Sequence, residues 1–142
     1  MHQVLLTAHI LAAIVTIGWL NVTALLAPSV IRRGDLPVLG VMGMWAKKIG
    51  PVGSVVFLLG LWLVGEGGAT FSDGWVSASM LLFILATVNG SVLIGGAMRA
   101  AGAKIAAGQP ATAEAGRVTL LGAVNALILV AITYLMVAKP GA

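Results

Sequence analysis

The sequence predicts an all-α fold, a transmembrane bundle of four helices with the N-terminus and the C-terminus outside. The 142 residues are 60% hydrophobic and only 8% charged, whereas soluble domains carry about 25% charged residues. The charged side chains avoid four long stretches, which are residues 4–31, 49–65, 75–98 and 118–138. About 20 apolar residues cross the hydrocarbon of a bilayer, and an ionised group at its centre costs about 3 kcal/mol or more. We therefore expect residues 1–142 to form a single integral membrane domain.

The first predicted helix covers residues 4–31 and ends at Arg32 and Arg33. At 1.5 Å per residue it is about 40 Å long, which exceeds the hydrocarbon thickness, so we expect it to tilt or to extend into the headgroups. Pro28 lacks a backbone N–H and is expected to kink the inner end. We interpret this stretch as a mature helix, because basic residues precede the apolar part of a signal peptide and here they follow it.

Residues 36–46 are uncharged but too short to span a bilayer. Because charged residues flank both ends, we expect this segment to lie in the membrane interface, with Trp45 at headgroup depth. The second helix is expected to begin near Gly50 and Pro51, since proline is tolerated in the first turn of a helix, and to end near Gly65.

The third and fourth helices are predicted at residues 75–98 and 118–138. The connection 66–74 is acidic and rich in glycine, which is typical of a solvated turn. The connection 99–116 is rich in small residues, and we expect it to be a mobile or partly helical linker.

Basic residues are shared unevenly between the connections. The second connection carries the acidic residues Glu66 and Asp73 and no basic residue. By the positive-inside rule, we expect connections one and three to be cytoplasmic in a multi-pass protein of a cell inner (plasma) membrane. The abundance of Ala, Gly and Val suits a bacterial source. The basic residues in or beside connections one and three are Arg32, Arg33, Lys47, Lys48, Arg99, Lys104 and Arg117.

Composition excludes several classes of function. The chain has no cysteine, which removes disulfides, thiolate catalysis and cysteine-based metal centres. No acidic residue lies in a predicted span, which argues against a proton- or sodium-coupled carrier. The net charge of +4 is spread over the connections and forms no stripe for nucleic acid. We predict no catalytic residues and no metal site.

Three asparagines, Asn21, Asn89 and Asn125, lie inside the predicted spans. Measured from the nearest basic boundary, each lies about 12–17 Å deep, close to the midplane. A primary amide in hydrocarbon needs hydrogen-bond partners, so we expect all three to face the interior of the bundle as an intramembrane polar cluster. Two interpretations stay open: interhelical hydrogen bonds that hold the bundle together, or a patch that lines a substrate or ion path. The hydroxyl groups expected to join them are those of Thr16, Thr23, Thr87 and Ser91.

His9 lies near the outer end of the first helix, on the same face as Thr16 and Thr23. A buried histidine can ligate haem or copper or relay protons; the alternative is a helix-end histidine satisfied by interfacial water or by a carbonyl group. A second haem ligand would have to be His2 folded back, or a methionine. The methionines at about the depth of His9 are Met80 and Met136, and packing is the more common role of such residues.

Small residues inside the spans follow a pattern that favours close helix packing. Ala86-x-x-x-Gly90 and Gly122-x-x-x-Ala126 match the small-x-x-x-small rule for membrane helices. This pattern predicts a tight bundle and permits oligomerisation.

The run Ala8-His9-Ile10-Leu11-Ala12-Ala13, with Gly18 nine residues after the histidine, resembles the first helix of a group of bacterial membrane proteins. The group includes copper-resistance D-like domains, J-type protoporphyrinogen oxidases and uncharacterised four-helix proteins of this size. The resemblance implies that His9 would be the haem ligand if the chain bound haem b. The chain lacks the further buried histidine and the charged intramembrane residues that the haem-binding relatives imply, so the uncharacterised relatives match best.

We expect a small polytopic membrane protein that acts as a non-catalytic accessory or scaffold subunit. It would pack in the lipid bilayer with itself, as a homo-oligomer, or with a larger membrane complex, and not with nucleic acid. Two alternatives from other classes are a haem-binding redox protein that uses His9, and a small channel or carrier lined by the intramembrane asparagines. A non-enzymatic role is favoured over an enzymatic one.

Overall fold

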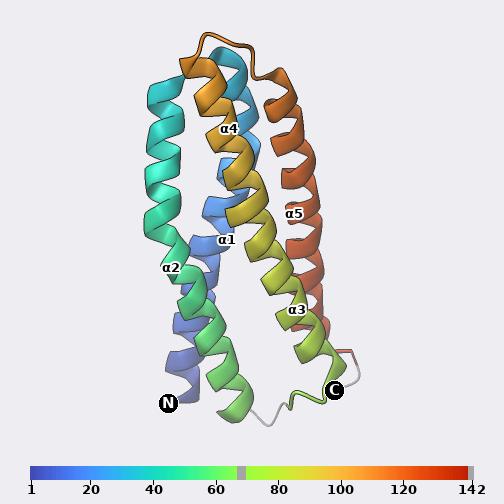
Figure 1. The fold of residues 1–142 in the computed structure, drawn as a ribbon. Coiled ribbons are helices and arrows are strands. Elements are labelled where there is room, and N and C mark those ends of the chain that lie inside the picture. Colours follow the sequence, from blue (N-terminus) through green and yellow to red (C-terminus); the bar gives the residue numbers. More distant parts are fainter. Residues whose placement is uncertain (67–69, 141–142) are drawn as a thin grey trace.

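The computed structural model describes residues 1–66 and 70–140 as an all-helical bundle. Its elements α3, η1 and α4 follow one another without a break, so the described chain forms four long rods that run side by side (Figure 1). Each rod is long and apolar enough to cross a membrane, which confirms the predicted fold class. The elements are α1 (His2–Arg33), α2 (Leu36–Glu66), α3 (Gly74–Val88), η1 (Asn89–Ile94), α4 (Gly95–Ala106) and α5 (Thr112–Ala138).

The turn between α1 and α2 is short because both helix ends are capped. Gly34 adopts the left-handed conformation with φ 68° and ends α1, a conformation that glycine adopts without steric cost. The Asp35 carboxylate accepts a 3.1 Å hydrogen bond from the backbone N–H of Val38 and caps α2. The second helix therefore begins at Leu36, and the predicted start near Gly50 and Pro51 is wrong.

Residues 36–46 are thus not a separate segment but the first turns of α2, and they run lengthwise along α1 (Figure 1). Their position relative to the bilayer interface stays a prediction. Pro51 lies inside the helix, where it removes one backbone hydrogen bond.

The helix after the second connection is longer than expected, because it continues past Arg99 to Ala106. The predicted linker 99–116 shrinks to residues 107–111, and α5 begins at Thr112. An ion pair of 2.6 Å between Lys104 and Glu114 joins the two helices across this turn. Of the predicted turn 66–74, residues 67–69 lie outside the described part of the chain.

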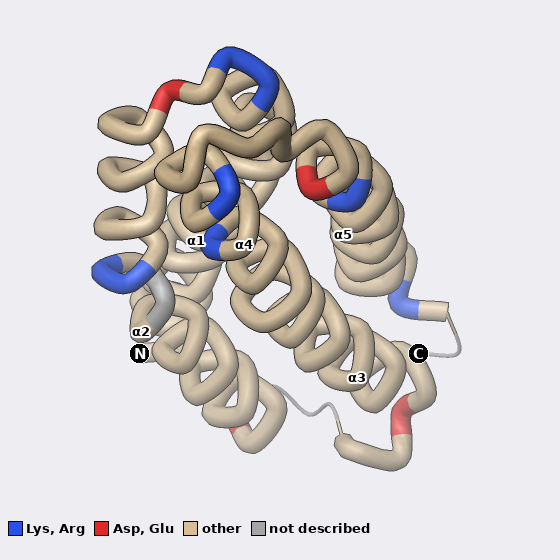
Figure 2. Tube along the Cα trace, turned by 45° about the horizontal axis from the view of Figure 1, so that its top comes forward, with Lys and Arg blue, Asp and Glu red and all other residues tan. Residues whose placement is uncertain are grey.

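The two described termini lie at the same end of the bundle, opposite the turns that follow α1 and α4 (Figure 1). Basic residues gather towards the turn end in Figure 2. Lys47 and Lys48, in the body of α2, and Lys139, at the C-terminal end of α5, are exceptions. The ammonium group of Lys48 lies 5.3 Å from the centre of the Trp45 ring, a cation–π contact.

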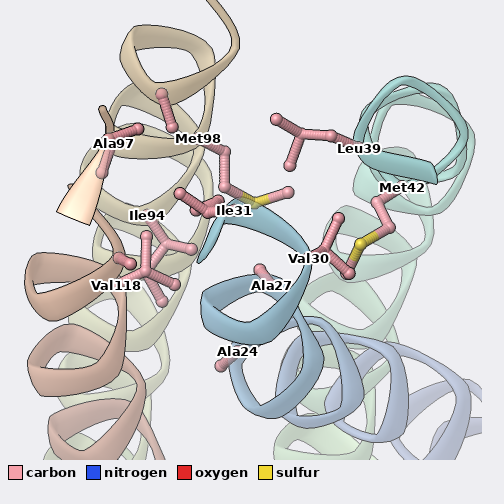
Figure 3. Packing of buried hydrophobic residues seen from close by; sticks show 13 residues of the cluster. Ala24, Ala27, Val30, Ile31, Leu39, Met42, Ile94, Ala97, Met98 and Val118 are labelled. Atoms are coloured by element: carbon pink, nitrogen blue, oxygen red, sulfur yellow. The ribbon is translucent and has the colours of Figure 1, made fainter. Parts of the chain in front are cut away.

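The larger hydrophobic core lies in the turn half of the bundle, where α1 meets the start of α2, α4 and the start of α5. Figure 3 shows Ala27, Val30 and Ile31 of α1 at its centre, between Leu39 and Met42 on one side and residues of α4 and α5 on the other. A smaller cluster, built on Ala86, Leu129 and Ile132, joins α3 and α5 nearer the termini.

Helices α1 and α5 approach each other closely at Ala24 and Gly122. A Cβ atom built on Gly122 would lie 2.9 Å from the Cβ of Ala24 and 3.4 Å from its carbonyl oxygen. Pro28 has no N–H to donate to this carbonyl, which is its usual helical acceptor. The glycine therefore lets α5 approach a carbonyl group that α1 itself leaves without its helical donor, a position suited to a weak Cα–H···O contact.

We predict that Gly122→Leu destabilises the bundle by about 1–3 kcal/mol, because a larger side chain cannot enter the contact with Ala24 without moving the helices apart. The measurement is unfolding by sodium dodecyl sulfate in mixed micelles, followed by circular dichroism. Gly116→Leu on the same helix is the matched control, because a Cβ there meets nothing within 4 Å. Equal losses in both variants would contradict the assigned contact.

Candidate functional site

The structure distributes the predicted polar residues among three different places. Asn89 and Asn125 meet between η1 and α5. His9 and Thr16 lie between α1 and α2, where each contacts a glycine. Asn21 lines a groove along α1 and α5. The residues predicted to form one intramembrane cluster therefore lie in three separate environments.

The Asn89–Asn125 pair is the most buried of the three. The Nδ2 of Asn89 donates to the carbonyl oxygen of Leu121 at 2.9 Å and to the Oδ1 of Asn125 at 3.4 Å. Asn125 is 0% exposed, and within the described part of the chain its own Nδ2 has no partner. One amide thus joins the third rod to α5 with two hydrogen bonds, which is how polar groups hold membrane helices together.

The element η1 positions Asn89. Over Asn89–Ile94 the helix widens to π geometry, and the N–H of Gly95 bonds to the carbonyl of Gly90. A π-helical turn changes the direction in which the following side chains point and is frequent at functional sites. Gly90 faces α1 here, because a Cβ built on it would lie 2.9 Å from a methyl carbon of Leu20. The sequence predicts one helix over residues 75–98 and does not predict this π turn.

Between α1 and α2, two side chains fit against two glycines. A Cβ built on Gly60 would lie 3.2 Å from the Cε1 of His9, and one built on Gly53 would lie 3.6 Å from the Cγ2 of Thr16. Both pairs are seven residues apart along their helices, so the contact repeats every two turns, as in an antiparallel coiled coil. This register makes His9 and Thr16 packing residues of one helix contact.

In the described chain, three of the four hydroxyl groups predicted to join the asparagines bond within their own rods, and the fourth, that of Thr23, does not. The Thr16 hydroxyl donates to the carbonyl of Ala12 at 2.9 Å, and those of Thr87 and Ser91 also donate to their own rod. Thr23 is buried, and its hydroxyl has no partner among the described residues. None of these hydroxyl groups bonds to one of the asparagine side chains in the described residues.

Asn21 has a different environment from the other two asparagines. Among the described residues its Nδ2 donates only to the carbonyl of Ile17 in its own helix, at 3.0 Å, and the side chain is half-buried. The groove beside it has a volume of about 540 Å³. Because Ala24 faces Gly122 in the antiparallel α5, Asn21 lies at about the level of Asn125 but on the outer side of the helix contact. The other residues that line the groove are Ala126, Leu129, Val130, Thr133, Tyr134 and Val137.

The surroundings of His9 bear on the haem and copper hypotheses. The Nδ1 of His9 is buried and has no hydrogen-bond partner in the described chain, and the ring lies against α2. Met80 and Met136 belong to α3 and α5. Within residues 1–66 and 70–140, no group of three or more His, Cys, Asp or Glu is arranged to hold a metal ion.

We predict that Gly60→Val lowers stability by about 1–3 kcal/mol, because its side chain enters the space that the His9 ring fills. Adding His9→Ala to Gly60→Val should restore part of the loss, since the smaller side chain makes room. Unfolding in mixed micelles measures both effects. Gly65→Val is the control, because a Cβ there meets nothing within 4 Å. A Soret band that haem-supplied protein shows and His9→Ala loses would instead make His9 a haem ligand.

We also predict unequal effects of the two buried asparagines. Asn89→Leu removes both interhelical bonds and leaves the Asn125 amide unpaired, whereas Asn125→Leu keeps the bond from Asn89 to Leu121. Asn89→Leu should therefore cost more, and the double variant should cost less than the sum by about 0.6–1.7 kcal/mol. A double-mutant cycle on unfolding free energies measures this coupling. Strictly additive losses would show that the two amides do not interact.

Comparisons with known proteins agree with this architecture. The family model described as "Predicted integral membrane protein (DUF2269)" matches residues 3–140, nearly the whole chain. No curated protein and no solved structure matches the chain. None of these comparisons supports the resemblance to copper-resistance D-like domains or to J-type protoporphyrinogen oxidases. With four membrane-crossing helices and this match, the chain belongs to the DUF2269 family of integral membrane proteins.

Proposed function

We propose that the protein is a non-catalytic subunit of a membrane assembly, and that it binds a second copy of itself through the face of α1 and α5 around Asn21. The observation that carries the proposal is the Asn21 amide. It lies in a groove on the outside of the bundle, and its only hydrogen bond in the described chain goes to its own helix.

An amide in this position favours helix association. Hydrocarbon offers no hydrogen bonds, so a polar group that faces lipid gains by meeting a polar group of another helix. Apolar side chains provide no such gain, because lipid tails are as apolar as they are. No donor among the described residues reaches the Oδ1 of Asn21, which leaves this oxygen as the acceptor for a partner.

A second copy of the chain is the partner that best satisfies the hydrogen-bonding groups of Asn21. The side chain carries both a donor and an acceptor, so two Asn21 side chains related by a two-fold axis can bond reciprocally, as in an isologous dimer. Gly18 lies one turn away on the exposed side of α1, and a Cβ there would meet nothing within 4 Å. This glycine lets a second α1 helix approach closely.

The two alternative functions gain less support from the geometry. Asn89 and Asn125 are almost fully buried between helices and bonded to one another, which favours the interhelical interpretation over a conduit. His9 contacts a glycine of α2, which favours packing over haem ligation. The groove at Asn21 is therefore the feature around which we build the function.

The test uses the absence of native cysteine. We predict that Gly18→Cys forms disulfide-linked dimers when native membranes are oxidised, because a two-fold axis near Asn21 brings the two copies of residue 18 together. Adding Asn21→Leu should weaken the dimer about 5- to 30-fold, the equivalent of about 1–2 kcal/mol of interhelical hydrogen bonding. Gel electrophoresis without reductant measures the dimer fraction.

Leu58→Cys is the matched control, because this residue is also exposed, at 62%, but lies on α2. It should give no more dimer than random collision does. Dimers that form equally well from Leu58→Cys, or that survive Asn21→Leu unchanged, would overturn the proposed interface. A crosslinked product with the mass of another protein would replace the second copy with a different partner.

A further inference from the structure

We infer that the groove between α4 and α5 at the turn end of the bundle binds a phospholipid with an anionic headgroup. This groove has a volume of about 310 Å³ and is separate from the groove at Asn21. The third rod lines it with Val92, Leu93, Gly96, Ala97 and Ala100, and α5 lines it with Ala113, Glu114 and Arg117.

The groove has the polarity of a lipid molecule along its length. Arg117 lies five residues after the start of α5 and Arg99 seven before the end of α4, so both lie about 8–10 Å below the turn. Val92 and Leu93 lie about another 10 Å deeper along the rod. Arg117 thus borders the upper part, the Arg99 guanidinium reaches down beside Gly95 and Gly96, and the apolar Val92 and Leu93 follow below it, in the order of headgroup and acyl chain.

Two guanidinium groups are available along the groove. Arg117 lines the groove itself. The Arg99 side chain lies along its own helix, with Nη1 3.5 Å from a Cβ built on Gly95 and Nη2 4.0 Å from one built on Gly96. Gly96 is a wall residue, so this guanidinium borders the groove. Within the described chain neither arginine forms an ion pair.

The one carboxylate of the groove does not cancel these charges. Glu114 already pairs with Lys104 at 2.6 Å, and the hydrogen bond from Lys104 lowers the pKa of Glu114. The acid therefore stays ionised at neutral pH and its charge is balanced by the lysine. Two unpaired positive charges remain, which fit a phosphodiester and favour an anionic over a zwitterionic headgroup.

The shape of the walls also suits an acyl chain. Gly96, Ala97, Ala100 and Ala113 keep the groove open where larger side chains would fill it. A soluble phosphate would use only the arginines, whereas a lipid would use the arginines and the apolar walls together. The continuity of the two parts in one groove is the reason for choosing a lipid.

The test is native mass spectrometry of the intact protein with dioleoyl-phosphatidylglycerol, dioleoyl-phosphatidylcholine or glycerol 3-phosphate as the probe. We expect retention of phosphatidylglycerol over phosphatidylcholine. Arg117→Gln should weaken that retention about fivefold, as should Arg99→Gln. Arg32→Gln, an exposed arginine at the same end that does not line the groove, should stay within about twofold, as expected for a charge outside the site.

A second variant tests the apolar walls without changing any charge. Gly96→Leu should abolish phosphatidylglycerol retention while the protein stays folded, because a Cβ at residue 96 meets only Arg99, at 4.0 Å. If an arginine variant fails to fold, this variant still decides the matter. Three results would overturn the inference: equal retention of both lipids, an equal loss in Arg32→Gln, or tight binding of glycerol 3-phosphate that Gly96→Leu leaves unchanged.

Discussion

Close approach of helix backbones at small residues is the constraint on which the rest of this bundle depends. In a bilayer no hydrophobic effect draws apolar helices together, so association needs many short van der Waals contacts and a few polar ones. Here α1 provides them on several sides, with Ala24 against Gly122 of α5 and Leu20 against Gly90 of η1. His9 and Thr16 face glycines of α2 in the same way. Helix α1 packs mainly on α2 and α5, and the third rod packs mainly on α5.

The polar groups of the spans follow from this arrangement. Where backbones are close, an amide reaches the next helix, as Asn89 reaches Leu121 and Asn125. Where a helix has lipid beside it, an amide can bond only backwards to its own turn, as Asn21 does. An asparagine at the same depth thus either joins two helices or bonds within its own helix. The distance to the neighbouring backbone determines which of the two occurs.

The four long helices could be predicted from the sequence, but most of the arrangement of the candidate sites could not. Charge-free stretches predicted four apolar helices, because the cost of burying charge in lipid keeps most ionised side chains out of the spans. The start of α2 is ambiguous in the sequence, because Asp35 and Pro37 form one start signal and Gly50 and Pro51 form another. Depth could be counted along each helix, but which face each asparagine presents depends on helix rotation. The π geometry of η1 after Asn89 also changes that rotation, and periodicity does not reveal it.

The rods contain 27 to 33 residues and are therefore about 40–50 Å long, against a hydrocarbon of about 30 Å. If the apolar end of α5 at Ala138 lies at one boundary, the other boundary falls near residue 118, just below Arg117. The larger core, which includes Leu39, Ala101 and Ala115, then extends into the headgroup region and beyond. There water is present and the hydrophobic effect operates again. The turn end can thus pack as a soluble bundle does, whereas the half in the hydrocarbon depends on its glycines and amides.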